Sequence, residues 1–362
     1  MDRRDRTFKP EAGTTGRVSF VLGRRSGEEA GPTGVLGHFL ARDGSRGAQV
    51  RVDLDGPHAA LIVGKRGAGK SYTAGVLAEA LSDAAGVAPV VVDPMGVFDG
   101  LADCGARVLE NPAVAAGALS PRAWCDLLSL SPEGSVGGLV WEAATAAGTL
   151  AGMREAVDGT EAPASDRRAA ANHLRLAASW DAFDPEGLDA EGLTEPAGTV
   201  LDVSGLAPAP TNAVVRAVAD ALYRARIEAA VPRLPWLLVD EAHALFSGVA
   251  GPGLERLLTR GRAPGVSLVA ATQRPSALPA VAASQADLLV AHHLTSGVDI
   301  EALRHTRPTY LDDLGDRLPD GTGEALVVDE ATETTHTVTV RERKTPHAGD
   351  SPSASSLGEE VG

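Results

Sequence analysis

Runs of consecutive apolar residues, separated by segments with helical spacing, form the main pattern from about residue 56 onward. Residues 59–63 (AALIV) are apolar throughout, as expected for a strand buried on both faces of a parallel sheet. Residues 71–81 follow with apolar positions at helical spacing. Similar strand-like runs recur at 89–96, 198–206, 235–243, 266–275, 286–294, 323–329 and 336–343. Strands that alternate with helices predict an α/β fold with a mainly parallel sheet, and the last two runs are candidates for an antiparallel pair.

Two regions depart from this alternation. Residues 17–55 contain short strand-like runs between glycine-rich turns, which predict a short β segment. Residues 101–195 are alanine-rich pieces with helical spacing, and no strand stands out among them. We therefore expect a helical insertion there, as a lid or subdomain, which divides the core into residues 56–100 and 196–344.

The two ends of the sequence, residues 1–16 and 345–362, are polar and are predicted to be disordered. The first residues contain no hydrophobic segment after their charges, so they do not resemble a signal peptide. No apolar run reaches the roughly 20 residues that a membrane helix needs. Cys104 and Cys125 are the only cysteines, too few for a disulfide framework or a zinc cluster. We expect a cytoplasmic protein with reduced cysteines and no membrane segment.

The composition is acidic and poor in lysine. The formal net charge is -15, and only four of the 33 basic residues are lysines. Such chains are typical of organisms with molar salt in the cytoplasm, where the Debye length falls to about 3 Å and self-repulsion is screened. A GC-rich genome is the alternative explanation, because it also replaces Lys with Arg and enriches Ala and Gly. The acidic excess favours a halophilic source.

The segment GKRGAGKS, residues 64–71, matches the P-loop pattern G-x-x-x-x-G-K-S. Its glycines let the backbone turn tightly and aim successive N–H groups at phosphate oxygens, and the next helix adds its positive N-terminus. Lys70 is expected to place its ammonium on the β- and γ-phosphates, and the Ser71 hydroxyl to bind Mg²⁺. The motif lies between an apolar strand and a helix, so we expect a nucleoside triphosphate site. Its candidate residues are Gly64, Lys65, Arg66, Gly67, Ala68, Gly69, Lys70, Ser71 and Tyr72.

An apolar strand, WLLVDEAH, ends in the adjacent carboxylates Asp240 and Glu241. Asp240 is the candidate for the Mg²⁺ shell, and Glu241 is the candidate base that orients and deprotonates the attacking water. The next strand-like run ends in ATQRP, where Gln273 is expected to sense the γ-phosphate or the water. Asp93, at the end of the run PVVVDPMG, is either a supporting polar group or only the start of a turn before Pro94.

Asp-Glu-Ala-His at 240–243 also spells the box of a helicase superfamily that requires a second, similar domain. About 120 residues follow His243, and we expect that they leave no room for such a domain. His243 is therefore given a capping or packing role and no catalytic one.

The segment LLTRGRAPGV supplies two candidate arginine fingers, Arg260 and Arg262, with Arg262 preferred. An arginine at a subunit edge can stabilise the transition state on a neighbour's γ-phosphate. The alternative is that both arginines only complement the dipole at a helix C-terminus.

GKRGAGKSYTAGVLAE, VVVDPMGVF, LLVDEAHALF, TRGRAPGVSLVAATQRPSALP and LPDGTGEALVV, in this order, resemble the HerA-like ATPases of the HerA/FtsK superfamily. The resemblance covers about residues 50–330, without most of 100–195. It implies a RecA-like P-loop NTPase core, ATP and Mg²⁺ as cofactors, and a hexameric ring around double-stranded DNA. By the same resemblance Asp240 is the Walker B acid, Glu241 the catalytic base, Gln273 the sensor and Arg262 the finger in trans.

Two functional hypotheses follow. The first is a ring-forming DNA translocase driven by ATP hydrolysis, which is the reading that the resemblance favours. The second is a nucleotide-dependent switch or scaffold that binds a protein partner through the insertion. The chain has no basic run or aromatic stacking pattern of its own, which argues weakly against DNA. Arg167, Arg168 and Arg175 in the insertion are DNA-binding candidates, although a solvated helix face is the better explanation for them.

Overall fold

The computed structural model describes residues 20–24, 31–41, 43–305 and 314–347. The predicted disorder of residues 1–16, and of all but the first three residues of 345–362, therefore lies outside the described residues. The described strands are β1 Phe20–Leu22, β2 Thr33–Leu40, β3 Arg46–Asp53, β4 Ala59–Val63, β5 Val87–Asp93, β6 Arg107–Glu110, β7 Thr199–Asp202, β8 Leu234–Val239, β9 Ser267–Thr272, β10 Leu288–Ala291, β11 Glu324–Asp329 and β12 Thr334–Val340.

The described α-helices are α1 Lys70–Ser82, α2 Pro121–Leu127, α3 Ser135–Ala146, α4 Leu150–Gly159, α5 Ala164–Ala178, α6 Ala190–Leu193, α7 Pro208–Ile227, α8 Ala242–Phe246, α9 Gly251–Arg260, α10 Ala280–Gln285, α11 Gly297–His305 and α12 Leu314–Arg317. Three 3₁₀ turns accompany them in the described ranges, namely η1 Asp99–Cys104, η2 Ala116–Ala118 and η3 Pro275–Ala277.

All described strands join one sheet in the order β1-β3-β2-β12-β11-β10-β4-β9-β8-β5-β7-β6. From β10 to β6 every neighbouring pair is parallel, whereas β10 to β3 pair in the antiparallel sense. The predicted α/β fold with a mainly parallel sheet is confirmed, and so is the antiparallel pair β11–β12. The P-loop strand β4 lies in the middle of the sheet, between β10 and β9.

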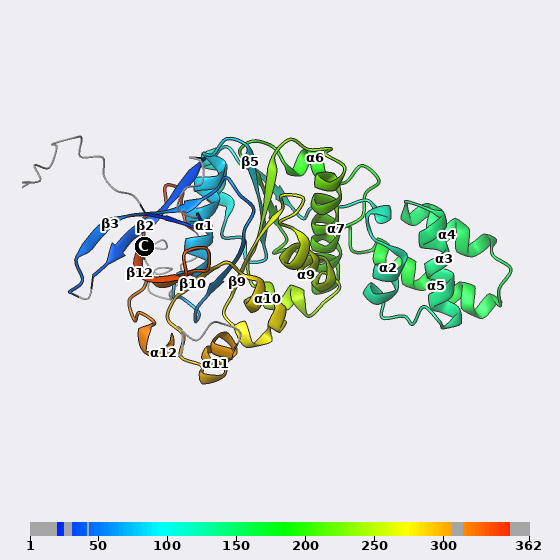
Figure 1. Cartoon of the computed structure of the whole chain (residues 1–362). Coiled ribbons are helices and arrows are strands. Elements are labelled where there is room, and N and C mark those ends of the chain that lie inside the picture. Colours follow the sequence, from blue (N-terminus) through cyan, green and yellow to red (C-terminus); the bar gives the residue numbers. More distant parts are fainter. Residues whose placement is uncertain (1–19, 25–30, 42, 306–313, 348–362) are drawn as a thin grey trace, which may run out of the picture.

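Side chains of the central strands alternate between two hydrophobic clusters, one on each face of the sheet. In β4, Leu61 packs in the cluster beneath α7 and α9, and Ile62 packs in the cluster beneath α1. Both faces are therefore covered by helices, as the continuous apolar runs predict. Figure 1 shows α1 on one side of the sheet and α7 with α9 on the other.

The helical insertion covers fewer residues than the predicted 101–195. Helices α2 to α5 pack on one another beyond α7, at the end of the molecule away from β1–β3 (Figure 1). The expectation that no strand lies within residues 101–195 is wrong, because β6 pairs in parallel with β7 and forms the edge of the sheet. β6 has only four residues and its burial pattern is that of an edge strand, so it lacks the continuous apolar run that identifies central strands.

The short N-terminal strands belong to the main sheet. β2 pairs with β12, so the segment near the start of the described chain is held by the last described strand. The predicted disorder is wrong at Thr345, which is buried and donates both its N–H and its hydroxyl to the carboxylate of Glu79 on α1. The polar composition of the tail conceals this contact because the anchoring partner is distant in sequence.

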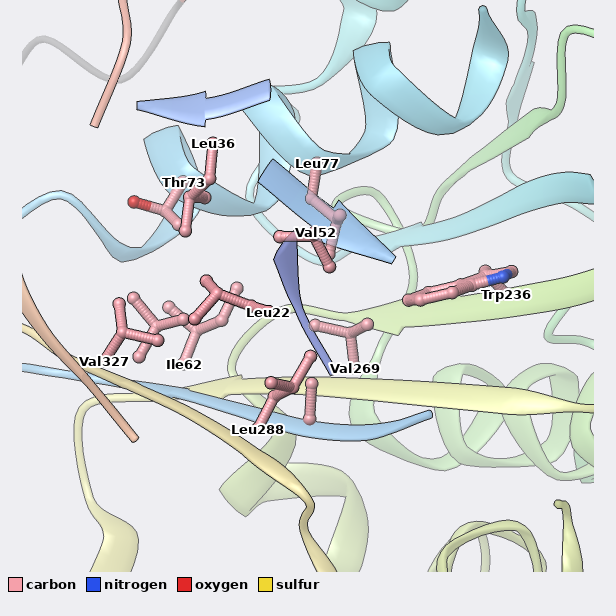
Figure 2. A pocket seen from close by; sticks show the side chains of 12 residues that line it. Leu22, Leu36, Val52, Ile62, Thr73, Leu77, Trp236, Val269, Leu288 and Val327 are labelled. Atoms are coloured by element: carbon pink, nitrogen blue, oxygen red, sulfur yellow. The ribbon is translucent and has the colours of Figure 1, made fainter. Parts of the chain in front are cut away.

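An apolar cavity of about 20 Å³ lies between α1 and the sheet. Figure 2 shows side chains from β1, β2 and β3 facing those of the central strands, with Trp236 at one end and Thr73 at the other. The volume suffices for a single water molecule, and the lining is almost wholly apolar. The cavity is thus a packing void of the core and not a substrate pocket.

Candidate nucleotide-binding and hydrolysis site

The loop between β4 and α1 has the backbone conformation that phosphate binding requires. Gly67 and Gly69 have φ values of 76° and 111°, a region that side-chain-bearing residues rarely adopt. A Cβ atom at Gly64 would lie 2.7 Å from the Cβ atom of His292, so only glycine fits at that position. The positive end of α1 then faces the space in front of the loop.

Lys70 begins α1 and is 6% exposed. Its Nζ donates to the carbonyl oxygen of Lys65 at 3.1 Å. Burial lowers the pKa of Lys70, while the nearby Glu241 and Asp240 raise it. The ammonium is therefore held over the loop, between the backbone and the acid pair.

The remaining predicted loop residues differ in accessibility. Lys65, Arg66 and Gly67 are exposed, whereas Ala68 is buried. Tyr72 packs beside the cluster beneath α1, and its hydroxyl accepts a 2.7 Å hydrogen bond from the N–H of Arg343. The side chain of Tyr72 thus holds the C-terminal segment, and only its backbone is free to serve the predicted nucleotide-binding role.

The acid pair follows β8, which lies two strands from β4 with β9 between them. Asp240 is 3% exposed, and its Oδ2 accepts a 2.6 Å hydrogen bond from the Ser71 hydroxyl. Its Oδ1 accepts the N–H of Glu241 at 2.9 Å. The sheet therefore brings together the two residues predicted to bind Mg²⁺.

Glu241 has φ 46° and ψ 39°, a left-handed conformation that is strained for a residue other than glycine. Burial and the neighbouring Asp240 raise the pKa of Glu241, while Lys70 and a hydrogen bond from Gln273 oppose the rise. Burial makes the ionised carboxylate a stronger proton acceptor, as a general base requires. Gln273 directly follows β9 and lies near Glu241, while its predicted contact with the γ-phosphate or the water stays a prediction.

The donors at this point are suited to Mg²⁺. Ser71 and Asp240 offer a hydroxyl and a carboxylate oxygen, the hard ligands that Mg²⁺ prefers, and Mg²⁺ usually keeps waters and substrate phosphates as its other ligands. Over the described ranges, no group of three or more His, Cys, Asp or Glu side chains is arranged to hold a metal ion. The residues fit an ion bound jointly by the protein and a nucleotide, not one held by the protein alone.

His292 packs against Gly64 and Gly69 of the P-loop, a role that was not predicted from the sequence. It is fully buried, and its Nδ1 lies 2.7 Å from the carbonyl oxygen of Glu324. Because a carbonyl only accepts, Nδ1 carries the proton and Nε2 accepts the hydroxyl of Thr73 at 2.9 Å. Burial lowers the pKa of His292 to about 4, so the ring is neutral. A polar residue at the end of a strand beside the P-loop strand was the available signal.

Asp93 caps a turn. It is buried, and its two carboxylate oxygens accept the N–H groups of Met95 at 3.1 Å and Phe98 at 2.8 Å. Burial raises the pKa of Asp93 to about 6, and the nearby Asp202 adds to the rise, while these backbone hydrogen bonds oppose it. Of the two roles considered for Asp93, the contacts favour the turn.

Arg262 is not brought to the P-loop of its own chain. Its guanidinium lies 3.2 Å from Asp287, which also accepts the N–H of Ala59 at the start of β4. The P-loop follows the other end of β4, so Arg262 lies at the opposite edge of the sheet. Arg260, the last residue of α9, is exposed and precedes the same edge.

Among the described residues, none of the helices combines the length and the apolar character that crossing a bilayer requires.

The chain is similar to one protein family over part of its length and to several solved structures. The family described as "Helicase HerA, central domain" matches residues 35–146, which include the P-loop and α1. VirB4 of Thermoanaerobacter pseudethanolicus is 17% identical with a TM-score of 0.67, over 88% of this chain and 99% of that chain. The comparison with curated proteins finds no match.

A bacterial conjugative coupling protein, TrwBΔN70, has a similar structure, with 16% identity and a TM-score of 0.53 over 83% of this chain and 88% of that chain. TrwB in complex with the non-hydrolysable GTP analogue GDPNP gives 16% identity and a TM-score of 0.52, over 79% of this chain and 87% of that chain. These likenesses concern the fold, which is that of RecA-like P-loop ATPases. The family match covers residues 35–146, so the similarity to the HerA central domain concerns that part of the chain, and the solved structures support the fold.

Proposed function

We propose that the protein hydrolyses ATP with Mg²⁺ and that it acts as a ring-forming motor on double-stranded DNA. The hydrolysis part is supported above all by one relationship, the convergence of Ser71, Asp240 and Glu241 in front of the P-loop. The motor part is supported by the match to the HerA central domain over residues 35–146 and by the fold. The hexameric ring and the DNA substrate come from the resemblance.

In the proposed reaction the loop N–H groups and Lys70 bind the β- and γ-phosphates of ATP. Lys70 exchanges its hydrogen bond to the Lys65 carbonyl for one to phosphate oxygen. Ser71 and Asp240 would hold Mg²⁺, which would supply positive charge against the phosphate oxygens.

Glu241 accepts a proton from the attacking water, whose oxygen bonds to the γ-phosphorus as the bond to the β–γ bridging oxygen breaks. Gln273 lies near Glu241 and orients its carboxylate. The products are ADP and inorganic phosphate.

Glu241→Gln tests the assignment of the base. Glutamine keeps the shape of the side chain but accepts no proton, so we expect turnover to fall by at least about 100-fold while ATP binding is retained. Glu142→Gln, the same chemical change on an exposed residue of α3, is the matched control. ATP hydrolysis and the binding of a fluorescent ATP analogue should be measured for both variants. Wild-type turnover by Glu241→Gln would contradict the assignment.

The second candidate function is a nucleotide-dependent switch that binds a protein partner without moving DNA. Trp141 on α3 and Leu176 on α5 are 39% and 53% exposed, and both belong to the projecting insertion. Long duplex DNA, added at low and at molar salt, separates the two functions. Stimulation of ATP hydrolysis that grows with DNA length supports the motor, and its absence at both salt concentrations supports the switch.

A further inference from the structure

His243 lies beside the candidate base, although the sequence analysis gave it only a packing role. It is the second residue of α8, and its side chain is 18% exposed. Its Nδ1 is 3.3 Å from Glu241 Oε2 and 3.2 Å from the hydroxyl oxygen of Thr272. One nitrogen therefore faces both the base and the end of β9.

Glu241 needs such a neighbour. Its Oε2 is buried and receives no well-formed hydrogen bond from the described residues, and the 3.3 Å contact with His243 is long and poorly aligned. Catalytic hydrogen bonds are often long before substrate binds and shorten in the reacting complex. The strained backbone of Glu241 fixes where its side chain starts but not how the carboxylate is turned.

Thr272 links His243 to the end of β9, the strand that Gln273 follows. It is fully buried, and its hydroxyl oxygen accepts the N–H of Arg274 at 3.0 Å. Gln273, between these two residues, reaches the carboxylate of Glu241. His243 and Gln273 thus bracket one carboxylate, and both are attached to the same strand end.

The charge of His243 suits this role. Burial lowers the pKa of His243, and the cations Arg274 and Lys70 lower it further, against the opposing effect of Asp240. A neutral imidazole has one N–H, and the nearby carboxylate favours placing it on Nδ1. Nδ1 can then donate to Glu241 and Thr272 without adding a full positive charge beside the base.

We propose that His243 is a positioning residue that orients the carboxylate of Glu241 and couples it to the tip of β9 through Thr272. The inference rests on the proposed role of Glu241 as the base. His243 touches neither water nor phosphate in this scheme. It limits the rotation of the carboxylate so that the other oxygen faces the attacking water, and a misplacement of about 1 Å at such a group can cost about 100-fold in rate.

The test compares His243→Ala with His243→Asn, because the amide nitrogen of asparagine occupies the place of Nδ1. We expect kcat for ATP to fall about 10- to 100-fold in His243→Ala. The KM for ATP and the melting temperature should stay close to wild type, and His243→Asn should recover most of kcat. His173→Ala, on partly exposed α5, is the control histidine and should behave as wild type.

A double-mutant cycle with Thr272→Val checks the coupling. If His243 acts through Thr272, the loss of kcat in the double variant is smaller than the product of the two single losses. Wild-type kcat in His243→Ala, or equal losses of kcat, affinity and melting temperature without rescue by asparagine, would overturn the proposal. If Glu241→Gln keeps its activity, the assignment of Glu241 as the base is wrong. If Glu241→Gln is inactive but His243→Ala hydrolyses ATP at the wild-type rate, only the role of His243 is wrong.

Discussion

The hydroxyl of Ser71 donates a 2.6 Å hydrogen bond to Oδ2 of Asp240, a residue 169 positions later in the chain. This contact joins the end of the P-loop to the end of β8 across the intervening β9. In the proposed site the two residues bind Mg²⁺ together, so the loss of either should weaken Mg²⁺ binding.

Asp240→Asn should therefore lower Mg²⁺-dependent ATP hydrolysis by at least about 100-fold, since the metal accounts for several kcal/mol of transition-state stabilisation. Asparagine keeps the size of the side chain but removes its charge. Rates should be measured over a Mg²⁺ titration, where Asp240→Asn should require more metal than wild type to reach half its own maximum. Asp126→Asn, on the exposed side of α2, is the control. An unchanged Mg²⁺ requirement would argue against Asp240 as a metal ligand.

Arg262 can reach a γ-phosphate only on another subunit, because it lies at the edge of the sheet opposite its own P-loop. Arg262→Ala and Lys70→Ala should each be inactive alone if Arg262 is a finger in trans. Mixed in equal amounts before assembly, they should recover activity, since about a quarter of randomly formed interfaces would pair an intact P-loop with an intact arginine.

The ATPase rate of the mixture, compared with each variant alone, is the measurement for that prediction. Arg260→Ala mixed with Lys70→Ala serves as the control, because Arg260 is the less favoured of the two arginines. No recovery in a mixture that still assembles would exclude Arg262 from this role.

Glu79 on α1 binds the segment of residues 341–345 through hydrogen bonds. Its fully buried carboxylate accepts hydrogen bonds from Arg341 at 2.6 Å, from the N–H of Lys344 at 2.9 Å, and from Thr345. Glu79→Ala removes the acceptor that these donors share and leaves the buried Thr345 without it, so it should cost about 3–5 kcal/mol in the free energy of unfolding. Denaturant unfolding measures this loss. Asp83→Asn breaks the exposed pair with Lys344 and should cost less than about 1 kcal/mol.

His292 should make stability fall in mild acid. Burial lowers its pKa to about 4 from 6.5, so between these values the unfolded chain binds more protons than the fold does. Stability contributed by the neutral ring is thus complete above pH 6.5 and lost as the pH falls toward 4, by about 2 kcal/mol at pH 5. Denaturant unfolding at pH 7.5, 6 and 5 should show a shallower decline in His292→Asn than in wild type. His173→Asn is the control. If the free energy of unfolding falls as steeply with pH in His292→Asn as in His173→Asn, this assignment is wrong.

The residues of the candidate site can be found in the sequence because their motifs are local. The glycines of the P-loop, Lys70 and Ser71 stand within eight residues, and Asp240 and Glu241 are adjacent, so a strand that ends there carries both. Parallel strands expose their carboxyl ends at one edge of the sheet, which brings these motifs together without further information.

What the sequence conceals depends on pairs that are far apart along the chain. The tail residue Thr345 is polar, and only its partner Glu79 explains its burial. Tyr72 directly follows the P-loop, yet its side chain is turned toward Arg343. His243 is the second residue of α8 and His292 directly follows β10, and no spacing in the sequence distinguishes a positioning histidine from a packing one.

The pairing of β2 with β12 has a consequence for biosynthesis. Strands β2 and β3 leave the ribosome before the P-loop, but among the described strands they join the rest of the sheet only through β12, which ends at Val340. Closing so long a loop is entropically costly and slow. The nascent chain must therefore carry the β2–β3 hairpin without its partner in the sheet until β12 has been synthesised, and a chaperone that shields the free edge of β2 would act during that interval.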